Sequence, residues 1–244
     1  MKGRSEMKRI ILFLPLFLLI CCINKNQELS TGNDKKNKKS TAERKEVEKK
    51  YMSYDEFNKL YEKPFYLEGY NPVYEGHKKQ IKTAIKMIKD SKKPLIIAGA
   101  GILKANACEE LKEFIDKTNI PVAMTLLGLG SFPGSHDLAL GMIGMHGTTY
   151  ANYAANEADL IIAAGMRFDD RVTGNPQKFL PNAQIIHIDI DPAEIGKNKL
   201  IDVPIVGDLK NVLSDLNENA PKLLHDEWLK QIKKWKKEYS LIYR

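Results

Sequence analysis

From about residue 69 onward, hydrophobic and polar positions follow two alternating patterns. In one, apolar residues recur at spacings of three and four, as Ile81, Ala84, Ile85 and Ile88 do, which marks one face of a helix. In the other, a short unbroken apolar run is closed by glycine or aspartate, which is typical of a strand covered on both faces. We predict strands at five such runs: "KPLIIA", "IPVAM", "DLIIAA", "AQIIHID" and "VPIVG".

Helical segments separate these runs. "ANACEELKEFIDKTN" places Cys108, Leu111, Phe114 and Ile115 on one face, and "TTYANYAANEA" and "LKNVLSDLNENA" are also predicted helices. Strands that alternate with helices form parallel units with right-handed crossovers. The expected fold class is therefore α/β, with an open, mainly parallel, Rossmann-like sheet flanked by helices over residues 69–222.

A last helical segment, "DEWLKQIKKWKKEY", follows this domain. Trp228 and Trp235 stand seven residues apart and form an apolar stripe on it. We expect residues 223–244 to form an amphipathic helix that leads into a further, C-terminal domain and offers that domain a docking face.

The first 68 residues differ in composition. Residues 1–63 carry 15 Lys or Arg and 9 Asp or Glu, so most of the net charge of +7 lies there. The folded part is nearly neutral, which gives no reason to expect nucleic acid as its partner. We predict that residues 24–68, which are rich in lysine and poor in large apolar residues before residue 51, form a disordered or partly helical linker.

Residues 1–23 have the pattern of a targeting segment. Lys8 and Arg9 precede an apolar run whose length suits a signal peptide better than a membrane span. The run ends at Cys21 and Cys22, as in a bacterial lipoprotein leader, so these cysteines are candidate lipidation sites and the membrane a candidate partner. The leader implies a membrane-anchored or exported protein; an uncleaved anchor and a chance match are the alternatives.

The candidate binding edge lies where the predicted strands end, because open parallel sheets bind ligands at their carboxyl ends near a switch point. In "GMRFDDRVTG", Arg167 and Arg171 stand beside two aspartates. Guanidinium groups suit phosphate, and carboxylates suit ribose or ribityl hydroxyls; the alternative is a solvated ion-pair turn. "GAG" matches the start of a dinucleotide fingerprint but has Lys104 in place of the third glycine, so a tight turn is its alternative.

Catalytic and metal-binding patterns are missing from the sequence. The three cysteines include no CxxC pair, and no His/Cys cluster has metal-ligand spacing. Cys108 is expected to be a small core residue. No Ser-His-Asp, Cys-His or paired-carboxylate constellation is present, so we predict neither catalytic residues nor a metal site.

A family resemblance rests on two long motifs, "GMHGTTYANYAANEADLIIAAGMRFDDRVTG" and "IIHIDIDPAEIGKN". Through these the chain resembles the catalytic subunit of acetolactate synthase (acetohydroxyacid synthase), a thiamine-diphosphate-dependent enzyme of branched-chain amino acid biosynthesis, over residues 69–243. The resemblance implies the central domain, which in this branch holds structural FAD. In the family it stands between a domain with the glutamate that activates thiamine and a domain that binds diphosphate through Mg²⁺.

The resemblance also implies particular residues. Ala100 departs mildly from a turn that often has three glycines in the family. The channel to the substrate is implied at Met145, Asp170 and Arg171. The implied FAD-binding residues are Gly99, Ala100, Gly101, Thr125, Leu126, Ile143, Gly144, Met145, His146, Gly165, Met166, Arg167, Phe168, Asp169, Asp189, Ile190, Asp208 and Leu209.

Several of these residues also have plainer interpretations when the resemblance is set aside. His146 suits a surface loop, and His187 suits a strand position with its hydrogen bonds satisfied. Met124, Met142 and Met145 suit core packing.

Two motifs of the complete family enzyme are absent. The metal-diphosphate motif is Gly-Asp-Gly followed by paired asparagines, whereas "GDLKN" has Leu209 in place of the second glycine. The domain of the activating glutamate is absent as well. We therefore expect thiamine diphosphate and Mg²⁺ only in the complete family enzyme, and no acetolactate synthesis from pyruvate by the chain alone.

Two hypotheses follow. The first is a fragment of a thiamine-diphosphate enzyme that needs the flanking N- and C-terminal domains or a homodimer partner, its leader joined by gene rearrangement, since the family enzyme is cytoplasmic. The second is a genuinely exported, membrane-tethered lipoprotein that binds a nucleotide or small ligand without catalysis.

Overall fold

The computed structural model describes residues 72–241. The predicted leader, the candidate lipidation residues Cys21 and Cys22, and the linker at 24–68 lie outside the described residues. Within the described part, no helix is long and apolar enough to cross a membrane.

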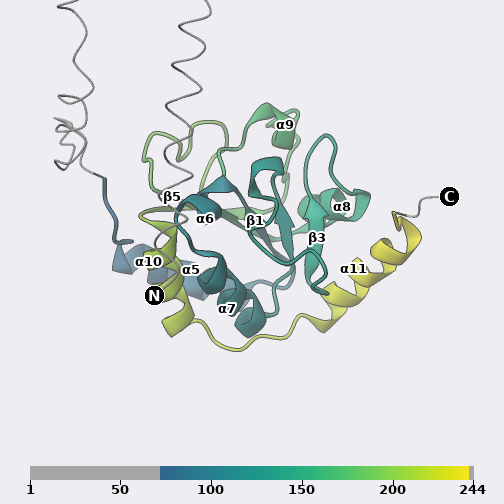
Figure 1. Cartoon of the computed structure of the whole chain (residues 1–244), viewed down its shortest axis with the longest axis horizontal. Coiled ribbons are helices and arrows are strands. Elements are labelled where there is room, and N and C mark those ends of the chain that lie inside the picture. The colour runs from purple at the N-terminus through teal and green to yellow at the C-terminus, as the bar shows by residue number, and fades with distance from the viewer. Residues whose placement is uncertain (1–71, 242–244) are drawn as a thin grey trace, which may run out of the picture. The chain divides into compact units, whose positions relative to one another are not determined.

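The described residues form an open, all-parallel sheet, which confirms the expected α/β class (Figure 1). The strand order is β3-β2-β1-β4-β5-β6, and every pairing is parallel. The chain therefore leaves β1 in one direction and returns to its other side at β4, which makes a switch point between these two strands. The strands are β1 (Pro94–Ala98), β2 (Val122–Met124), β3 (Ala139–Met142), β4 (Leu160–Ala164), β5 (Gln184–Asp189) and β6 (Val203–Val206).

The sheet has six strands where five were predicted, and β3 is the one that was missed. It lies at the edge of the sheet, and its pairing with β2 is irregular between Val122 and Met124. Gly141 sits inside it with φ +73°, so the residue pattern there suggests a loop more than a strand.

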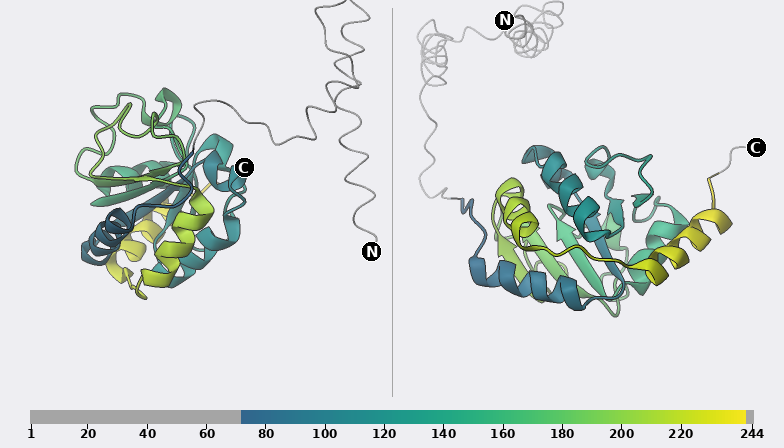
Figure 2. Two further views of the ribbon diagram at one scale, coloured as in Figure 1. Left: turned by 90° about the vertical axis from the view of Figure 1, so that its left-hand side faces the viewer. Right: turned by 90° about the horizontal axis from the view of Figure 1, so that it is seen from below.

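Helices cover both faces of the sheet (Figure 2). α5, α6, α7 and α10 bury apolar side chains in one core layer, and α8 and α11 do so in the other. The helices are α5 (Lys78–Asp90), α6 (Ala100–Lys104), α7 (Cys108–Thr118), α8 (Thr149–Glu157), α9 (Asp170–Thr173), α10 (Leu209–Asn219) and α11 (Asp226–Glu238), with a 3-10 turn, η1 (Leu126–Gly128).

Burial explains why α5 forms where it was predicted. Its N-cap, His77, makes no side-chain cap hydrogen bond. Its face of Ile81, Ala84, Ile85 and Ile88 is buried, as the spacing predicts. Each buried isoleucine contributes about 1.5–3 kcal/mol relative to an exposed one, which outweighs a missing cap.

α11 corrects one expectation. Trp228 is only 3% exposed and lies in the second core layer of this domain, where its Nε1 donates a hydrogen bond of 3.0 Å to Pro94 O. The prediction that the tryptophan stripe serves another domain is wrong for this residue. The physical reason is the segment 220–225, which crosses beneath the amino ends of the strands and carries the helix to the uncovered face (Figures 1 and 2).

Candidate functional site

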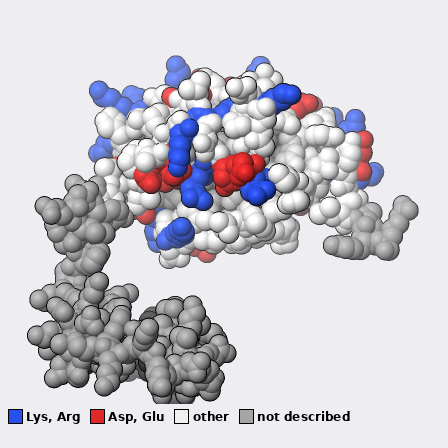
Figure 3. All heavy atoms as spheres, turned by 90° about the horizontal axis from the view of Figure 1, so that it is seen from above, with Lys and Arg blue, Asp and Glu red and all other residues white. Residues whose placement is uncertain are grey.

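The carboxyl ends of all six strands lie along one edge, because the strands are parallel and adjacent. The positions implied as FAD contacts all lie at these strand ends or in the loops and first helical residues that follow them, from Gly99 after β1 to Leu209 after β6. Figure 3 looks onto this side of the molecule and shows acidic and basic side chains next to one another at its middle. We call this surface the strand-end edge.

Glycines at the switch point allow two loops to pack backbone to backbone. Gly101 N donates to Gly165 O at 3.0 Å, and Gly99 N donates to Ala164 O at 2.9 Å. A Cβ atom on Gly99 would lie 2.1 Å from Gly165 O, and one on Gly101 would lie 2.6 Å from Gly165 Cα. The glycines of "GAG" are therefore required by the fold, as in the tight-turn alternative, whether or not a ligand binds above them.

Most of the polar candidates on the strand-end edge begin helices or turns. Asp169 Oδ1 accepts hydrogen bonds from the N–H groups of Arg171 and Val172, at 3.1 and 3.3 Å, and starts α9. Asp208 Oδ1 accepts from Lys210 N at 2.9 Å and starts α10. Such N-cap bonds satisfy backbone donors that the helix cannot.

Asp189 and Thr125 have similar local roles. Asp189 Oδ1 accepts from Asp191 N at 2.9 Å, directly after β5. Thr125 Oγ1 accepts from Gly128 N at 3.2 Å and caps η1. Among the described residues, the second carboxylate oxygen of Asp169, Asp189 and Asp208 makes no hydrogen bond, so it could accept one from a ligand hydroxyl.

The two arginines of "GMRFDDRVTG" are exposed. Within residues 72–241, neither forms an ion pair with Asp169, Asp170 or any other acid. The alternative of a solvated ion-pair turn is therefore not supported, and both guanidinium groups remain available to an anion.

Exposed apolar side chains lie at the same edge. Leu126, Leu127 and Met145 are 67%, 69% and 60% exposed, and Ile190 is 38% exposed. Met145 therefore does not pack in the core, whereas Met124, at 2% exposure, does. Apolar surface beside a few polar groups is typical of small-molecule sites.

The residues implied for a substrate channel lie in two loops that contact each other. Met145 N donates to Arg171 O at 2.9 Å, and Asp170 begins the same helical turn. Asn152 of α8 holds the first loop, because its side chain exchanges two hydrogen bonds of 3.0 Å with the backbone of Gly144. Sequence reasoning missed Asn152, since a lone asparagine in a helical segment gives no signal.

His187 lies beneath the strand-end edge and is fully buried. Its Nε2 donates to Met166 O at 2.7 Å, while Nδ1 has no hydrogen-bond partner among the described residues, so the expectation of a satisfied histidine holds for one ring nitrogen only. Burial lowers the pKa of its imidazole, against weaker opposing effects of the Met166 bond and nearby carboxylates. The histidine is therefore neutral at neutral pH.

Comparison with known proteins places the chain in a family. Residues 81–216 match the family described as "Thiamine pyrophosphate enzyme, central domain". The chain belongs to this family, which confirms the resemblance and the type of domain.

The relatives are large subunits of acetolactate synthase. An acetolactate synthase large subunit of Buchnera aphidicola subsp. Schizaphis graminum is 47% identical over 193 residues, which cover 78% of this chain and 34% of the relative. A probable acetolactate synthase large subunit of Methanocaldococcus jannaschii is 58% identical over 150 residues, covering 62% and 25%. The chain thus spans about a third or less of the length of these curated relatives.

Proposed function

We propose that the chain is the central domain of an acetolactate synthase and that it holds FAD at the strand-end edge. One observation carries this proposal: six strand ends bring exposed guanidinium groups, glycine loops and exposed apolar side chains to a single edge with a switch point. The choice of flavin over other nucleotides rests on the resemblance to acetolactate synthase, whose central domain holds structural FAD, and the relatives carry that name.

The residues of the edge fit the chemistry of FAD. Arg167 is exposed and has no ion-pair partner among residues 72–241, and a guanidinium matches two oxygens of a diphosphate at once. The free oxygen of Asp189 suits a ribose or ribityl hydroxyl. Leu126, Leu127 and Met145 offer an apolar surface to the flavin ring. When bound, the flavin would have a structural role.

The condensation of pyruvate is proposed for the complete protein only. In this proposal thiamine diphosphate and Mg²⁺ are bound by N- and C-terminal domains or by a homodimer partner, and the central domain completes the enclosure of the substrate. The chain alone would then bind flavin without catalysis.

A titration of the purified full chain with FAD, followed by quenching of flavin fluorescence, tests this proposal. A charge-assisted hydrogen bond contributes about 1.5–3 kcal/mol, so Arg167→Ala should weaken binding by roughly ten- to a hundredfold. Lys82→Ala is the matched control, because Lys82 is an exposed cation on α5. Equal affinities of the two variants, or preference for a nucleotide without flavin, would contradict the proposal.

A further inference from the structure

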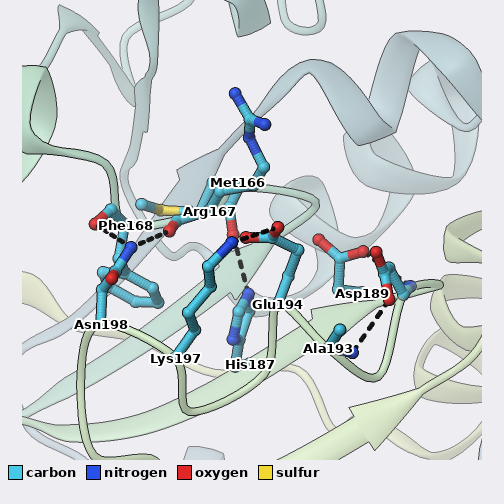
Figure 4. Close-up of polar contacts among 10 residues, drawn as sticks. Met166, Arg167, Phe168, His187, Asp189, Ala193, Glu194, Lys197 and Asn198 are labelled. Carbon is cyan, nitrogen blue, oxygen red and sulfur yellow. Dashed lines mark hydrogen bonds and ion pairs between the residues drawn. The ribbon is translucent and has the colours of Figure 1, made fainter.

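The turn of Met166, Arg167 and Phe168 is held by side chains from two other segments. His187 Nε2, on β5, donates to Met166 O at 2.7 Å. Asn198 Nδ2, in the loop between β5 and β6, donates to Arg167 O at 3.3 Å and to Phe168 O at 3.2 Å. Figure 4 shows these bonds reaching the turn. Three consecutive carbonyl groups are thus fixed by two side chains.

This turn depends on such support because its backbone is unfavourable. Phe168 has φ +49°, in the left-handed region that side chains other than glycine rarely adopt. Its ring is 3% exposed and lies edge-on to the His187 ring, with centroids 5.2 Å apart. The conformation therefore persists through contacts with β5 and the following loop rather than through local preference.

The conformation of this turn sets the direction of the Arg167 side chain. In Figure 4 the Arg167 side chain points away from His187 and Asn198, while the carbonyl groups point toward them. A group held in its binding orientation loses less freedom when a ligand arrives.

We propose that His187 and Asn198 are positioning residues, which hold the 166–168 turn so that Arg167 projects from the strand-end edge toward an anionic ligand. Neither side chain needs to contact the ligand. For the identity of the ligand, this inference rests on the proposed binding of FAD.

The loop that carries Asn198 is itself anchored. Lys197 and Glu194 form an ion pair of 3.0 Å. Lys199 Nζ donates to Pro176 O at 3.1 Å and to Phe179 O at 2.6 Å. Lys199 therefore helps to hold this loop in place. Asn219→Asp is the matched control for Asn198→Asp, because Asn219 Nδ2 on α10 donates to Asp215 O at 2.7 Å, outside the turn and the loop.

A double-mutant cycle tests the inference on the full chain, with FAD as the probe. Asn198→Asp keeps the size of the side chain but removes both donors, and we expect it to weaken FAD binding roughly tenfold. Asn219→Asp should leave the affinity unchanged. In the Asn198→Asp background, Arg167→Ala should add a smaller loss than it causes in the native chain, because the arginine is no longer positioned. Losses that simply multiply would overturn the inference.

A rescue pair tests His187 separately. His187→Gln retains an N–H donor near the position of Nε2, whereas His187→Leu has none. We expect the glutamine variant to bind FAD within about threefold of the native chain, and the leucine variant roughly tenfold more weakly. Equal losses in two folded variants would remove His187 from the inference. If the leucine variant does not fold, the Asn198 cycle decides.

Amide hydrogen exchange of the free chain separates failure of the inference from failure of the proposed function. We expect Asn198→Asp to speed exchange in a peptide covering residues 165–174, and Asn219→Asp to leave it unchanged. If the native chain binds no FAD, the proposed function fails. The exchange result alone then decides whether Asn198 holds the 166–168 turn. Unchanged exchange in Asn198→Asp would overturn the inference whether or not flavin binds.

Discussion

Substitution of Gly165 by alanine is the sharpest test of how the switch point is built. Gly165 has φ +63°. A Cβ atom there would lie 2.5 Å from Leu209 Cδ1 and 2.6 Å from Gly101 Cα. The leucine side chain can move, but the Gly101 backbone cannot move without disturbing the loop after β1.

The expected loss of stability combines three effects. A left-handed backbone costs about 1–2 kcal/mol for a residue with a Cβ atom, and overpacking costs typically about 1–3 kcal/mol. The more restricted unfolded chain offsets about 0.4–1 kcal/mol of this. We expect Gly165→Ala to lower the free energy of unfolding by about 3 kcal/mol, a large part of the roughly 5–15 kcal/mol of a typical domain.

Gly196→Ala is the matched control. Gly196 also has a left-handed backbone, with φ +76°, but a Cβ atom there would meet nothing within 4 Å. Its substitution should cost about 1 kcal/mol or less. Urea unfolding of both variants, followed by circular dichroism, measures the difference. If the two free energies agree to within about 0.5 kcal/mol, close packing of the loops does not explain the glycine.

Three further predictions concern pH, the last helix and activity. Burial lowers the pKa of His187 and His225 below the ordinary 6.5, so as the pH falls these histidines are protonated in the unfolded chain before they are protonated in the folded chain. The free energy of unfolding should therefore be highest above pH 6.5 and should fall as the pH drops from 6.5 toward the pKa values of the folded chain. His187→Gln should flatten this slope in urea titrations as the pH falls below 6.5, and an unchanged slope would contradict the contribution of His187. Trp228→Ala should lower the free energy of unfolding by about 3–5 kcal/mol. Leu224→Ala, at a position that is 78% exposed, should change it by no more than about 0.5 kcal/mol. Similar losses of stability for the two variants in thermal unfolding would contradict the packing of α11. The purified chain given pyruvate, thiamine diphosphate and Mg²⁺ should form no acetolactate in a colorimetric assay, and measurable product would refute this.

The longer helices and the central strands could be predicted because their burial repeats locally, whereas the short helices α6 and α9 were interpreted as loops. Leu111, Phe114 and Ile115 of α7 are all fully buried, as their spacing indicates. β1 and β4 are buried along their whole length, as unbroken apolar runs require. β3 could not be recognised in this way, since half of this edge strand is only partly buried and a glycine interrupts it.

Contacts between distant residues were beyond the reach of these patterns. Gly99 and Gly165 touch across 66 positions, and Asn198 bonds to Phe168 across 30. The stripe on α11 indicates that Trp228 packs against something, but not that it reaches Pro94. Periodicity describes which face of an element is apolar, whereas the partner of that face depends on topology.

Variants of the candidate residues at the strand-end edge report on different things, because some of these side chains also stabilise the fold. Asp169, Asp189 and Asp208 each accept backbone hydrogen bonds, so alanine there would remove a cap or turn as well as any ligand contact. Asparagine preserves an N-cap about as well as aspartate, so Asp169→Asn and Asp208→Asn change the charge at the edge while α9 and α10 keep their first turns. Arg167 has no such structural bond from its side chain within residues 72–241, and a loss of binding in its variants therefore reports on the ligand rather than on the fold.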